Sequence, residues 1–367
     1  MFLPPNLSAV LQDLKSILIT FFAAILSGVF LNWLSAPAPY LLGSLVGVWL
    51  LSTTNRALRE AMGIPRWFQI SVIVGLGTLV GANFQPGSAE QMLKWAPSIF
   101  SMFAATIIAT GIGLLYLVKL RKYEFNLALL SCIPGGQAEM VLISRELVEK
   151  DYVVALFHLV RVTMVFCFVP LLLAIIQGNE AVKASNISLA AMPSFLDLDV
   201  TILLYFVAIS IASLPLAKIV RLPMPHLLGP LITSSLLHIS GVIEIPRIHE
   251  FLVLAQITIG SVIGVRLASV DLSEIAKYLK DATLSAFFVV SAYILIAIGT
   301  SWIIDVQVLR MLLAFIPGGF YEVTLLALIF GFDVAFVAFH HTIRVILVFI
   351  ILPLVTSKQN VAKNQQN

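Results

Sequence analysis

Charge and cysteine are both scarce in this sequence of 367 residues. Only 11% of the residues are charged, whereas 60% are hydrophobic, and the mean hydropathy is +1.02. A soluble domain of this length could not bury so much apolar surface, and no hydrophilic stretch is long enough to form a separate soluble domain. These absences exclude a soluble protein and predict an all-α polytopic membrane protein.

The few cysteines and the scattered basic residues exclude further classes. Cys132 and Cys167 both lie in apolar segments, so we expect neither a structural disulfide nor a metal site built on them. The net charge of +3 forms no basic stripe, which argues against a nucleic-acid partner. We therefore expect the lipid bilayer as the surroundings of the chain, with no metal and no cofactor.

Three motifs occur twice, in the same order and at nearly the same spacing. "PAPYLLGSL" at 37–45 returns as "PMPHLLGPL" at 223–231, and "GTLVGANF" at 77–84 returns as "GSVIGVRL" at 260–267. "IPGGQAE" at 133–139 returns as "IPGGFYE" at 316–322, which is 183 residues later. Matching motifs in one order indicate an internal duplication. The predicted units are a first membrane repeat at 1–180, a linker at 181–198, a second membrane repeat at 199–357 and a polar C-terminal tail at 358–367.

Each half contains six apolar segments, and the fifth is interrupted by Pro-Gly-Gly. The expected segments are 17–34, 36–53, 67–84, 96–118, 126–144 and 152–176 in the first half, and 199–217, 224–243, 250–268, 283–304, 308–330 and 334–356 in the second. We call Pro134, Gly135 and Gly136 the first break, and Pro317, Gly318 and Gly319 the second break. Proline removes an amide donor, and the glycines are expected to permit a sharp reversal of the chain.

The distribution of Lys and Arg decides between two topologies. If the broken segments cross the bilayer, the halves are parallel; if they re-enter, each half has about five crossings and the second half is inverted. With both termini in the cytoplasm, the inverted model puts 16 of the 22 Lys and Arg residues inside, against 12 for twelve crossings. The sequence therefore predicts inverted repeats with re-entrant segments, in the inner (plasma) membrane. Such repeats with broken helices are typical of secondary transporters.

A glutamate follows each break at membrane depth, Glu139 in the first half and Glu322 in the second. Each should fall in the first turn of the helix that restarts after the break, where the positive end of the helix dipole favours a carboxylate. One interpretation is that the glutamates only cap these helices. The other is that they bind an ion or a substrate, since carboxylates inside membranes are usually functional.

The sixth segments carry "FHLVR" at 157–161 and "HHTIR" at 340–344. Residues three apart share a helix face, so His158 should lie beside Arg161, and His341 beside Arg344. The arginines could form structural ion pairs with the two glutamates, because the four charges sum to zero. Alternatively they form a clamp for an anion, with a protonatable histidine beside it.

The paired "IPGG…E" motifs, the paired "PYLLG" and "PHLLG" motifs and the duplication resemble the integral-membrane AbrB family, which is also described as ammonia monooxygenase-like. The resemblance covers essentially the whole chain. It implies either a membrane regulator of gene expression or an ammonia-oxidising enzyme. Glu139, His158, Glu322 and His341 are the sequence's one set of candidate ligands for copper or iron, and the Glu-x-x-His spacing of di-iron bundles is absent.

Three functional hypotheses follow from the sequence. The first is a secondary transporter or exporter of a small solute or ion, with the six residues Glu139, Glu322, Arg161, Arg344, His158 and His341 at a site between the repeats. The second is a membrane regulator or sensor that binds a ligand there and affects gene expression indirectly. The third, a metal-dependent monooxygenase, is the least favoured, so we expect no enzyme and no catalytic residue. The substrate stays open, and so does the oligomeric state, a homo-oligomer included.

Overall fold

The computed structural model describes residues 7–135, 140, 143–144, 147–269 and 272–364, and these ranges contain helices and no strand. Seven helices within them are long and apolar enough to cross a membrane. They are α1 (Leu7–Trp33), α6 (Ala96–Leu115) with the π-helical turn η1 (Tyr116–Leu120), α9 (Asp151–Gln177), α11 (Val200–Ile219), α13 (His249–Ala268), α14 (Leu272–Ile304) and α17 (Val334–Asn364). The predicted all-helical class, with several apolar helices of membrane-spanning length, is confirmed.

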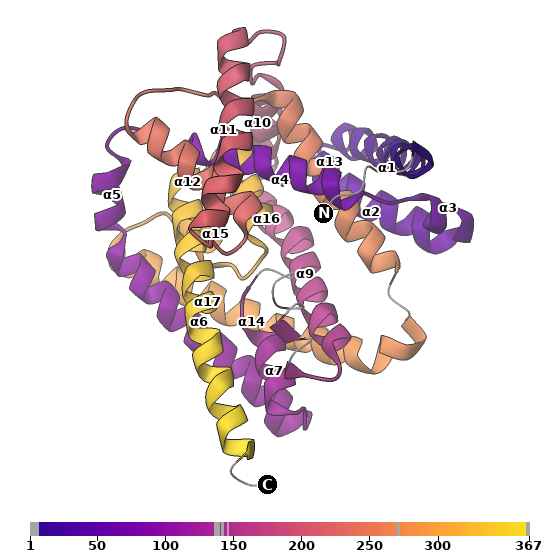
Figure 1. Cartoon of the computed structure of the whole chain (residues 1–367), viewed down its shortest axis with the longest axis vertical. Coiled ribbons are helices and arrows are strands. Elements are labelled where there is room, and N and C mark those ends of the chain that lie inside the picture. Colours follow the sequence, from indigo (N-terminus) through magenta and orange to yellow (C-terminus); the bar gives the residue numbers. More distant parts are fainter. Residues whose placement is uncertain (1–6, 136–139, 141–142, 145–146, 270–271, 365–367) are drawn as a thin grey trace.

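Shorter helices fill the remaining part of the bundle (Figure 1). They are α2 (Pro39–Thr54), α3 (Arg56–Ala61), α4 (Arg66–Gly81), α5 (Ser88–Lys94), α7 (Phe125–Cys132), α10 (Asn179–Ala190), α12 (Pro225–Ile239), α15 (Val308–Phe315) and α16 (Phe320–Ile329). Helix α10 occupies most of the expected linker at 181–198, and α5 precedes α6. Helix α14 also begins earlier than the expected segment at 283–304, at Leu272.

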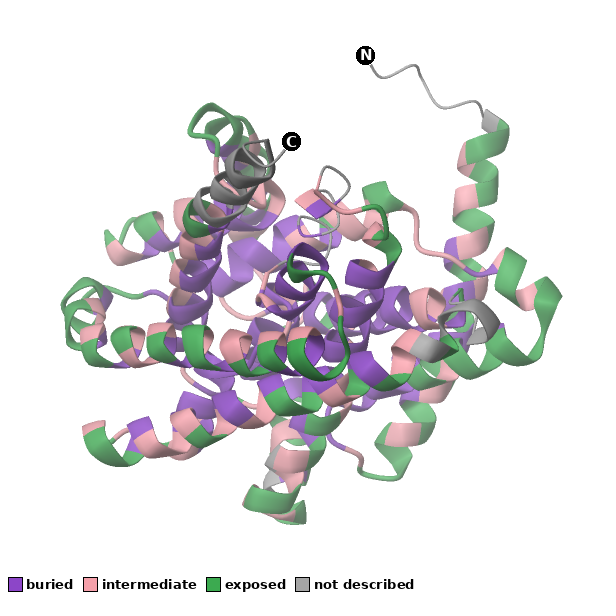
Figure 2. Ribbon diagram, turned by 90° about the horizontal axis from the view of Figure 1, so that it is seen from below, coloured by how far each residue is buried: buried purple, intermediate pink, exposed green. Residues whose placement is uncertain are grey.

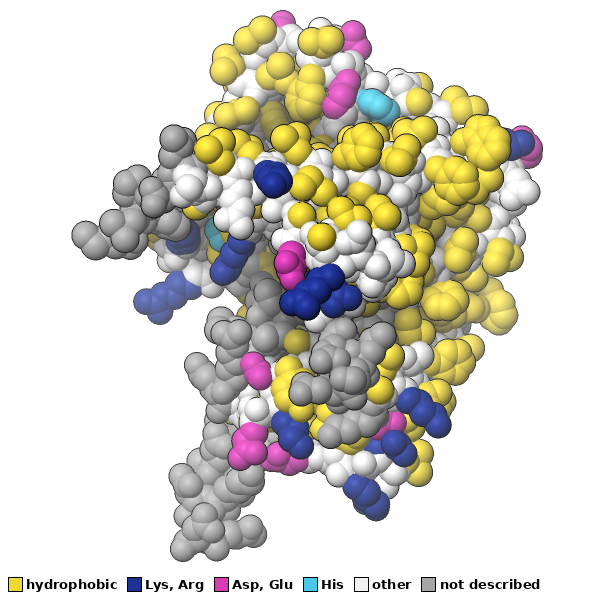
Figure 3. All heavy atoms as spheres, turned by 90° about the vertical axis from the view of Figure 1, so that its right-hand side faces the viewer, with side chains coloured by type: hydrophobic (Ala, Val, Ile, Leu, Met, Phe, Trp, Pro, Cys, Tyr) yellow, Lys and Arg dark blue, Asp and Glu magenta, His cyan; other side chains and the backbone are white. Residues whose placement is uncertain are grey.

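The outer surface of the bundle is apolar, as a bilayer requires. Large hydrophobic side chains such as Phe22, Phe100 and Ile175 are more than two thirds exposed. Figure 2 shows that buried residues gather in the centre of the bundle and exposed ones on the outer helices. Figure 3 shows hydrophobic side chains over the right-hand part of one face, with most Lys and Arg toward its lower and left-hand parts. Exposed apolar area of this extent suits lipid contact rather than water.

Small residues bring the two halves into close contact along two helix pairs. Helix α2 packs along α13, and α12 packs along α4. Gly260 and Gly264 of α13 face the carbonyl oxygens of Leu41 and Leu45 in α2, and a Cβ on Gly264 would lie only 2.7 Å from the Leu45 oxygen. Glycines allow membrane helices to approach backbone to backbone. In the second pair, Gly77 and Gly81 of α4 face the carbonyl oxygens of Leu227 and Leu231 in α12.

Helices α6 and α14 also join the halves. They pack against one another, and the Tyr293 hydroxyl of α14 donates a hydrogen bond of 2.9 Å to Thr106 Oγ1 of α6. Helix α14 of the second half reaches α9 of the first, and α17 reaches α6, where Ser98 Oγ lies 2.8 Å from His340 Nε2. The helices that pack around the two breaks therefore come from both halves of the chain.

Candidate functional site

The second break separates α15 from α16. Helix α15 ends at Phe315, residues 316–319 are not helical, and α16 begins at Phe320. Pro317 has no N–H to continue the ladder of α15. The last four carbonyls of any helix lack intrahelical donors, so in an apolar interior α15 needs donors from elsewhere.

Two side chains of α17 supply those donors. Arg344 Nη1 donates to the carbonyl oxygens of Phe315 at 2.9 Å and Ile316 at 3.2 Å. His341 Nε2 lies 2.9 Å from the carbonyl oxygen of Leu313, and Arg344 Nη2 lies 2.7 Å from His341 Nδ1. A cation is also favoured at the negative end of a helix dipole. The His-x-x-Arg pair is thus a side-chain cap for the end of α15.

The same contacts occur at the first break, where α7 ends at Cys132. Arg161 Nη1 donates to the Cys132 carbonyl oxygen at 3.0 Å, and Nη2 donates to that of Ile133 at 3.2 Å. His158 Nε2 lies 2.9 Å from the Leu130 carbonyl oxygen, and its Nδ1 lies 3.0 Å from Arg161 Nη2. Each of these residues stands 183 positions before its counterpart at the second break.

The hydrogen bonds assign one tautomer to both capping histidines. A carbonyl oxygen can only accept, so the Nε2 of His158 and of His341 carries the proton. An arginine can only donate, so the Nδ1 that faces it carries none. Both rings are therefore neutral in this arrangement, and both are fully buried. This geometry gives both histidines the task of holding the arginine and the helix end.

The arginines point toward backbone oxygens rather than into an open anion clamp. Both Nη atoms of Arg161 and of Arg344 meet carbonyl oxygens or an imidazole, and the residues are 3% and 4% exposed. The sequence left open whether each arginine pairs with a glutamate or clamps an anion, and the described contacts of both guanidinium groups are with backbone oxygens and the neighbouring histidines. The Nε of Arg161 is buried and has no hydrogen-bond partner among the described residues.

Glu322 lies in the first turn of α16 and is 4% exposed. Its carboxylate folds back over Gly319, where a Cβ would overlap the Oε2 atom. The φ of Gly319 is −66°, which any residue adopts, and Gly318 and Gly135 also avoid positive φ. At Gly319 the absent side chain leaves room for the Glu322 carboxylate. Glu139 and Gly136 lie outside the described residues.

Tyr293 of α14 is fully buried between the two breaks. It is not among the six candidate residues predicted from the sequence. The Arg344 guanidinium carbon lies 5.9 Å from the centre of its ring, and its hydroxyl interacts electrostatically with both Arg344 and Arg161. The available signal was a tyrosine in the middle of an apolar segment, where its hydroxyl needs a partner. The pairing with Thr106, on a helix nearly 190 positions earlier, could not be read from the sequence.

The outer ends of the broken segments are also held together. Arg310 near the start of α15 forms an ion pair of 2.6 Å with Asp333, which precedes α17, and its guanidinium lies 4.1 Å from the centre of the Phe336 ring. Asp333 also accepts from the Phe336 N–H at 3.0 Å, so it caps α17. A cleft of about 870 Å³ lies beside this end and is lined by Asn83, Arg247 and Asp333 among others.

No group of three or more His, Cys, Asp and Glu residues with metal-site geometry occurs in the part of the chain that the structure describes. Within that part, Cys132 and Cys167 are both free thiols. The described buried polar groups at the breaks are backbone oxygens, the Glu322 carboxylate, and the histidine and arginine side chains of the two caps.

Comparison with known proteins gives a consistent result. The family model described as transition state regulatory protein AbrB matches residues 52–358. The uncharacterized protein YhjN of Bacillus subtilis is 23% identical over 345 residues, which cover 87% of this chain and 90% of that protein. A proposed regulator, AbrB of Escherichia coli K12, is 24% identical over 308 residues, which cover 84% and 86% of the two chains.

Proposed function

The chain belongs to the AbrB family, and from that premise we propose that it is a secondary transporter of a small solute, with its site at the two breaks between the membrane repeats. The observation that carries this proposal is the recurrence of one buried His-x-x-Arg cap at both breaks. Irregular backbone at membrane depth is tolerated where it is buried in protein or lines a cavity, and in transporters such sites bind substrate or coupling ion.

The Arg310–Asp333 ion pair supports a re-entrant second segment. A straight helical path over the 23 residues between them would separate the two by about 35 Å at 1.5 Å per residue, whereas their side chains are 2.6 Å apart. Helix α15 therefore approaches the break from the end to which α16 returns. In the first half, one cleft is lined both by Tyr123 and Leu127, at the start of α7, and by Lys150, at the start of α9. This supports the same re-entry there.

The directions of α9 and α17 support the inversion of the second repeat. In Figure 1, α17 descends to the C-terminus at the lower edge, while α9 rises toward α10. These helices are counterparts in the two halves, so their opposite directions agree with inverted repeats at 1–180 and 199–357. The proposal keeps both chain termini in the cytoplasm and the protein in the inner membrane.

We assign different tasks to the six candidate residues. Glu322, with Glu139 as its counterpart, binds the coupling ion or a polar group of the solute, since an intramembrane carboxylate at a helix N-terminus is suited to that task. Arg161, Arg344, His158 and His341 are positioning residues that keep the broken ends satisfied. An acceptor oxygen, from the solute or from Glu139, would complete the free Nε of Arg161.

The name of the Escherichia coli relative favours a second candidate function, a membrane regulator that binds a ligand at the same site without moving it. The two are separated by binding and flux together. We would screen small organic and inorganic solutes by thermal shift of the purified protein, and then measure gradient-driven uptake of each stabilising solute into proteoliposomes. Uptake above protein-free vesicles supports the transporter. Binding without uptake for every stabilising solute would establish the regulator and overturn the transporter, and turnover of a bound solute would establish an enzyme.

A further inference from the structure

We propose that Asp281 of α14 locks the mouth of the first break and so controls access from water to its tip at Cys132. We call the cleft lined by residues 121–124, 127, 148–150 and 278 the first mouth; its volume is about 320 Å³. The inference rests on the proposed function only in taking the first break as a site, because access itself is measured without any substrate.

Asp281 is a buried carboxylate that ties the two halves together. Its side chain is 3% exposed and forms an ion pair of 2.6 Å with the Nε of Arg121. The hydroxyls of Tyr116 and Tyr123 donate to the same carboxylate at 3.2 and 3.0 Å. Three donors converge on this one buried carboxylate, whereas the Arg121 side chain is 46% exposed and so reaches it from the surface. All three come from the first half, whereas Asp281 belongs to the second.

The backbone between α6 and α7 is shaped to bring these donors together. The last turn of α6 widens into η1, where the Arg121 N–H bonds to the Tyr116 carbonyl oxygen at 3.1 Å. Lys122 then adopts the left-handed region, with φ of 61°. Single π-helical turns are frequent at functional sites. Burial and the nearby Asp281 charge raise the pKa of Tyr123, so its hydroxyl keeps the proton that it donates.

The other half does not contain this cluster. The positions 183 residues from Asp281, Tyr116, Arg121 and Tyr123 are occupied by Ser98, Gly299, Ile304 and Val306. None of the last three can donate a side-chain hydrogen bond. The second broken segment is instead held by the Arg310–Asp333 pair, and residues 183 positions before these are Leu127 and Lys150. Both breaks have the same His-x-x-Arg cap, whereas the Asp281 cluster holds the first broken segment and the Arg310–Asp333 pair holds the second. This difference is expected if the two segments close separately.

Asp281 lies one helical turn from the tip of the first break. Ser285 follows it by four residues on the same face of α14, and its Oγ lies 3.7 Å from Cys132 Sγ. Cys132 is fully buried and ends α7. Release of the carboxylate would let α14 and the start of α7 separate, and water would then reach this thiol.

The test is the rate at which N-ethylmaleimide labels Cys132 in the full-length protein, followed by mass spectrometry. Cys167→Ser is made in every variant, so that Cys132 is the single thiol. Removing a charge-assisted contact of this kind should raise the labelling rate about tenfold to a hundredfold in Asp281→Asn. Tyr123→Phe removes one neutral donor and should raise the rate by a smaller factor.

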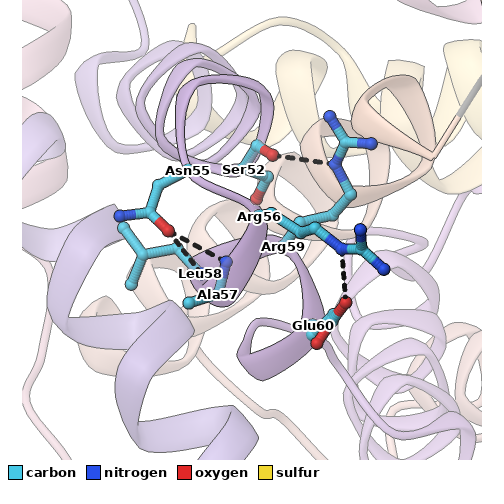
Figure 4. Close-up of polar contacts among 7 residues, drawn as sticks. All are labelled: Ser52, Asn55, Arg56, Ala57, Leu58, Arg59 and Glu60. Carbon is cyan, nitrogen blue, oxygen red and sulfur yellow. Dashed lines mark hydrogen bonds and ion pairs between the residues drawn. The ribbon is translucent and has the colours of Figure 1, made fainter.

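Two matched controls isolate the lock. Glu60 forms an exposed ion pair with Arg56 at 3.0 Å, in a small polar cluster at α3 (Figure 4), and Glu60→Gln should leave the rate unchanged. Asp333→Asn releases the contact at the other broken segment and should also leave Cys132 unreactive. If Asp281→Asn does not yield folded protein, Tyr123→Phe and Arg121→Gln decide the question. The proposal is overturned if Tyr123→Phe and Arg121→Gln both label Cys132 at the wild-type rate, or if Asp333→Asn accelerates the labelling as much as the variants of the Asp281 cluster do. Either result stands whatever the outcome of the transport assay.

Discussion

Arg344 Nη1 lies 2.9 Å from the carbonyl oxygen of Phe315, the last residue of α15. The contact joins a charge that is hard to keep in a membrane to a backbone acceptor that has lost its helical donor. The contact gives the carbonyl oxygen a donor and the buried guanidinium an acceptor. Arg161 makes the equivalent contact with the Cys132 carbonyl oxygen at 3.0 Å. The broken segments can therefore persist at membrane depth without an open cavity at the carbonyl end.

Removing either arginine should destabilise the protein to a similar extent. Arg344→Met keeps an unbranched side chain but leaves two buried carbonyls without donors, at a cost of about 2–5 kcal/mol. Arg161→Met should match it, as judged by the apparent unfolding temperature in detergent. Arg56→Met, which removes a 90% exposed partner of a surface pair, should change stability by less than about 0.5 kcal/mol. An effect of that small size in both buried variants would contradict the capping role.

The capping histidines should be replaceable by a neutral donor. His341→Gln can still donate an N–H toward Leu313 O, so it should lose less stability than His341→Phe, which cannot. Nitrogen-15 NMR of the histidine-labelled protein should report the Nε2–H tautomer for His158 and His341 at neutral pH. An imidazolium signal from either ring would show that the assignment is wrong.

The sequence predicts which side chains share a helix face, but not which backbone groups those side chains meet. The breaks at Pro134 and Pro317 and the shared face of each His-x-x-Arg pair follow from local rules of helix geometry. The partner of each arginine does not, because the orphaned carbonyl belongs to a different helix whose approach depends on packing. The contact of the Glu322 carboxylate with Gly319 was also not predictable, because it depends on how the side chain folds back over the break.

Gly319→Ala should disturb Glu322 without disturbing the fold. The added methyl group overlaps the Glu322 carboxylate, which can swing aside because it is the flexible end of its side chain. We expect a loss of solute binding with an unfolding temperature close to that of the wild type. Gly299→Ala on α14 is the matched control, since a Cβ there meets nothing within 4 Å. Unaltered binding in Gly319→Ala would argue against Glu322 as a ligand.

The glycines between the halves should resist substitution for a different reason. In Gly260→Ala the new Cβ meets the Ser44 hydroxyl and lies 2.5 Å from the Leu41 carbonyl oxygen, and the rigid backbone cannot yield. The expected loss of stability is about 1–3 kcal/mol. Gly111→Ala on α6, where a Cβ meets nothing, should instead gain up to about 1 kcal/mol. Equal effects of the two substitutions on the unfolding temperature would exclude close packing at Gly260.

The central claim is that the two breaks form a transport site in which Glu322 takes part. Its most direct test is solute counterflow into proteoliposomes, measured with wild-type protein, Glu322→Gln and the surface control Glu60→Gln, for a solute that the thermal-shift screen has identified. We expect counterflow by the wild type and by Glu60→Gln, and its loss in Glu322→Gln at equal reconstitution. Counterflow that continues undiminished in Glu322→Gln would contradict this claim.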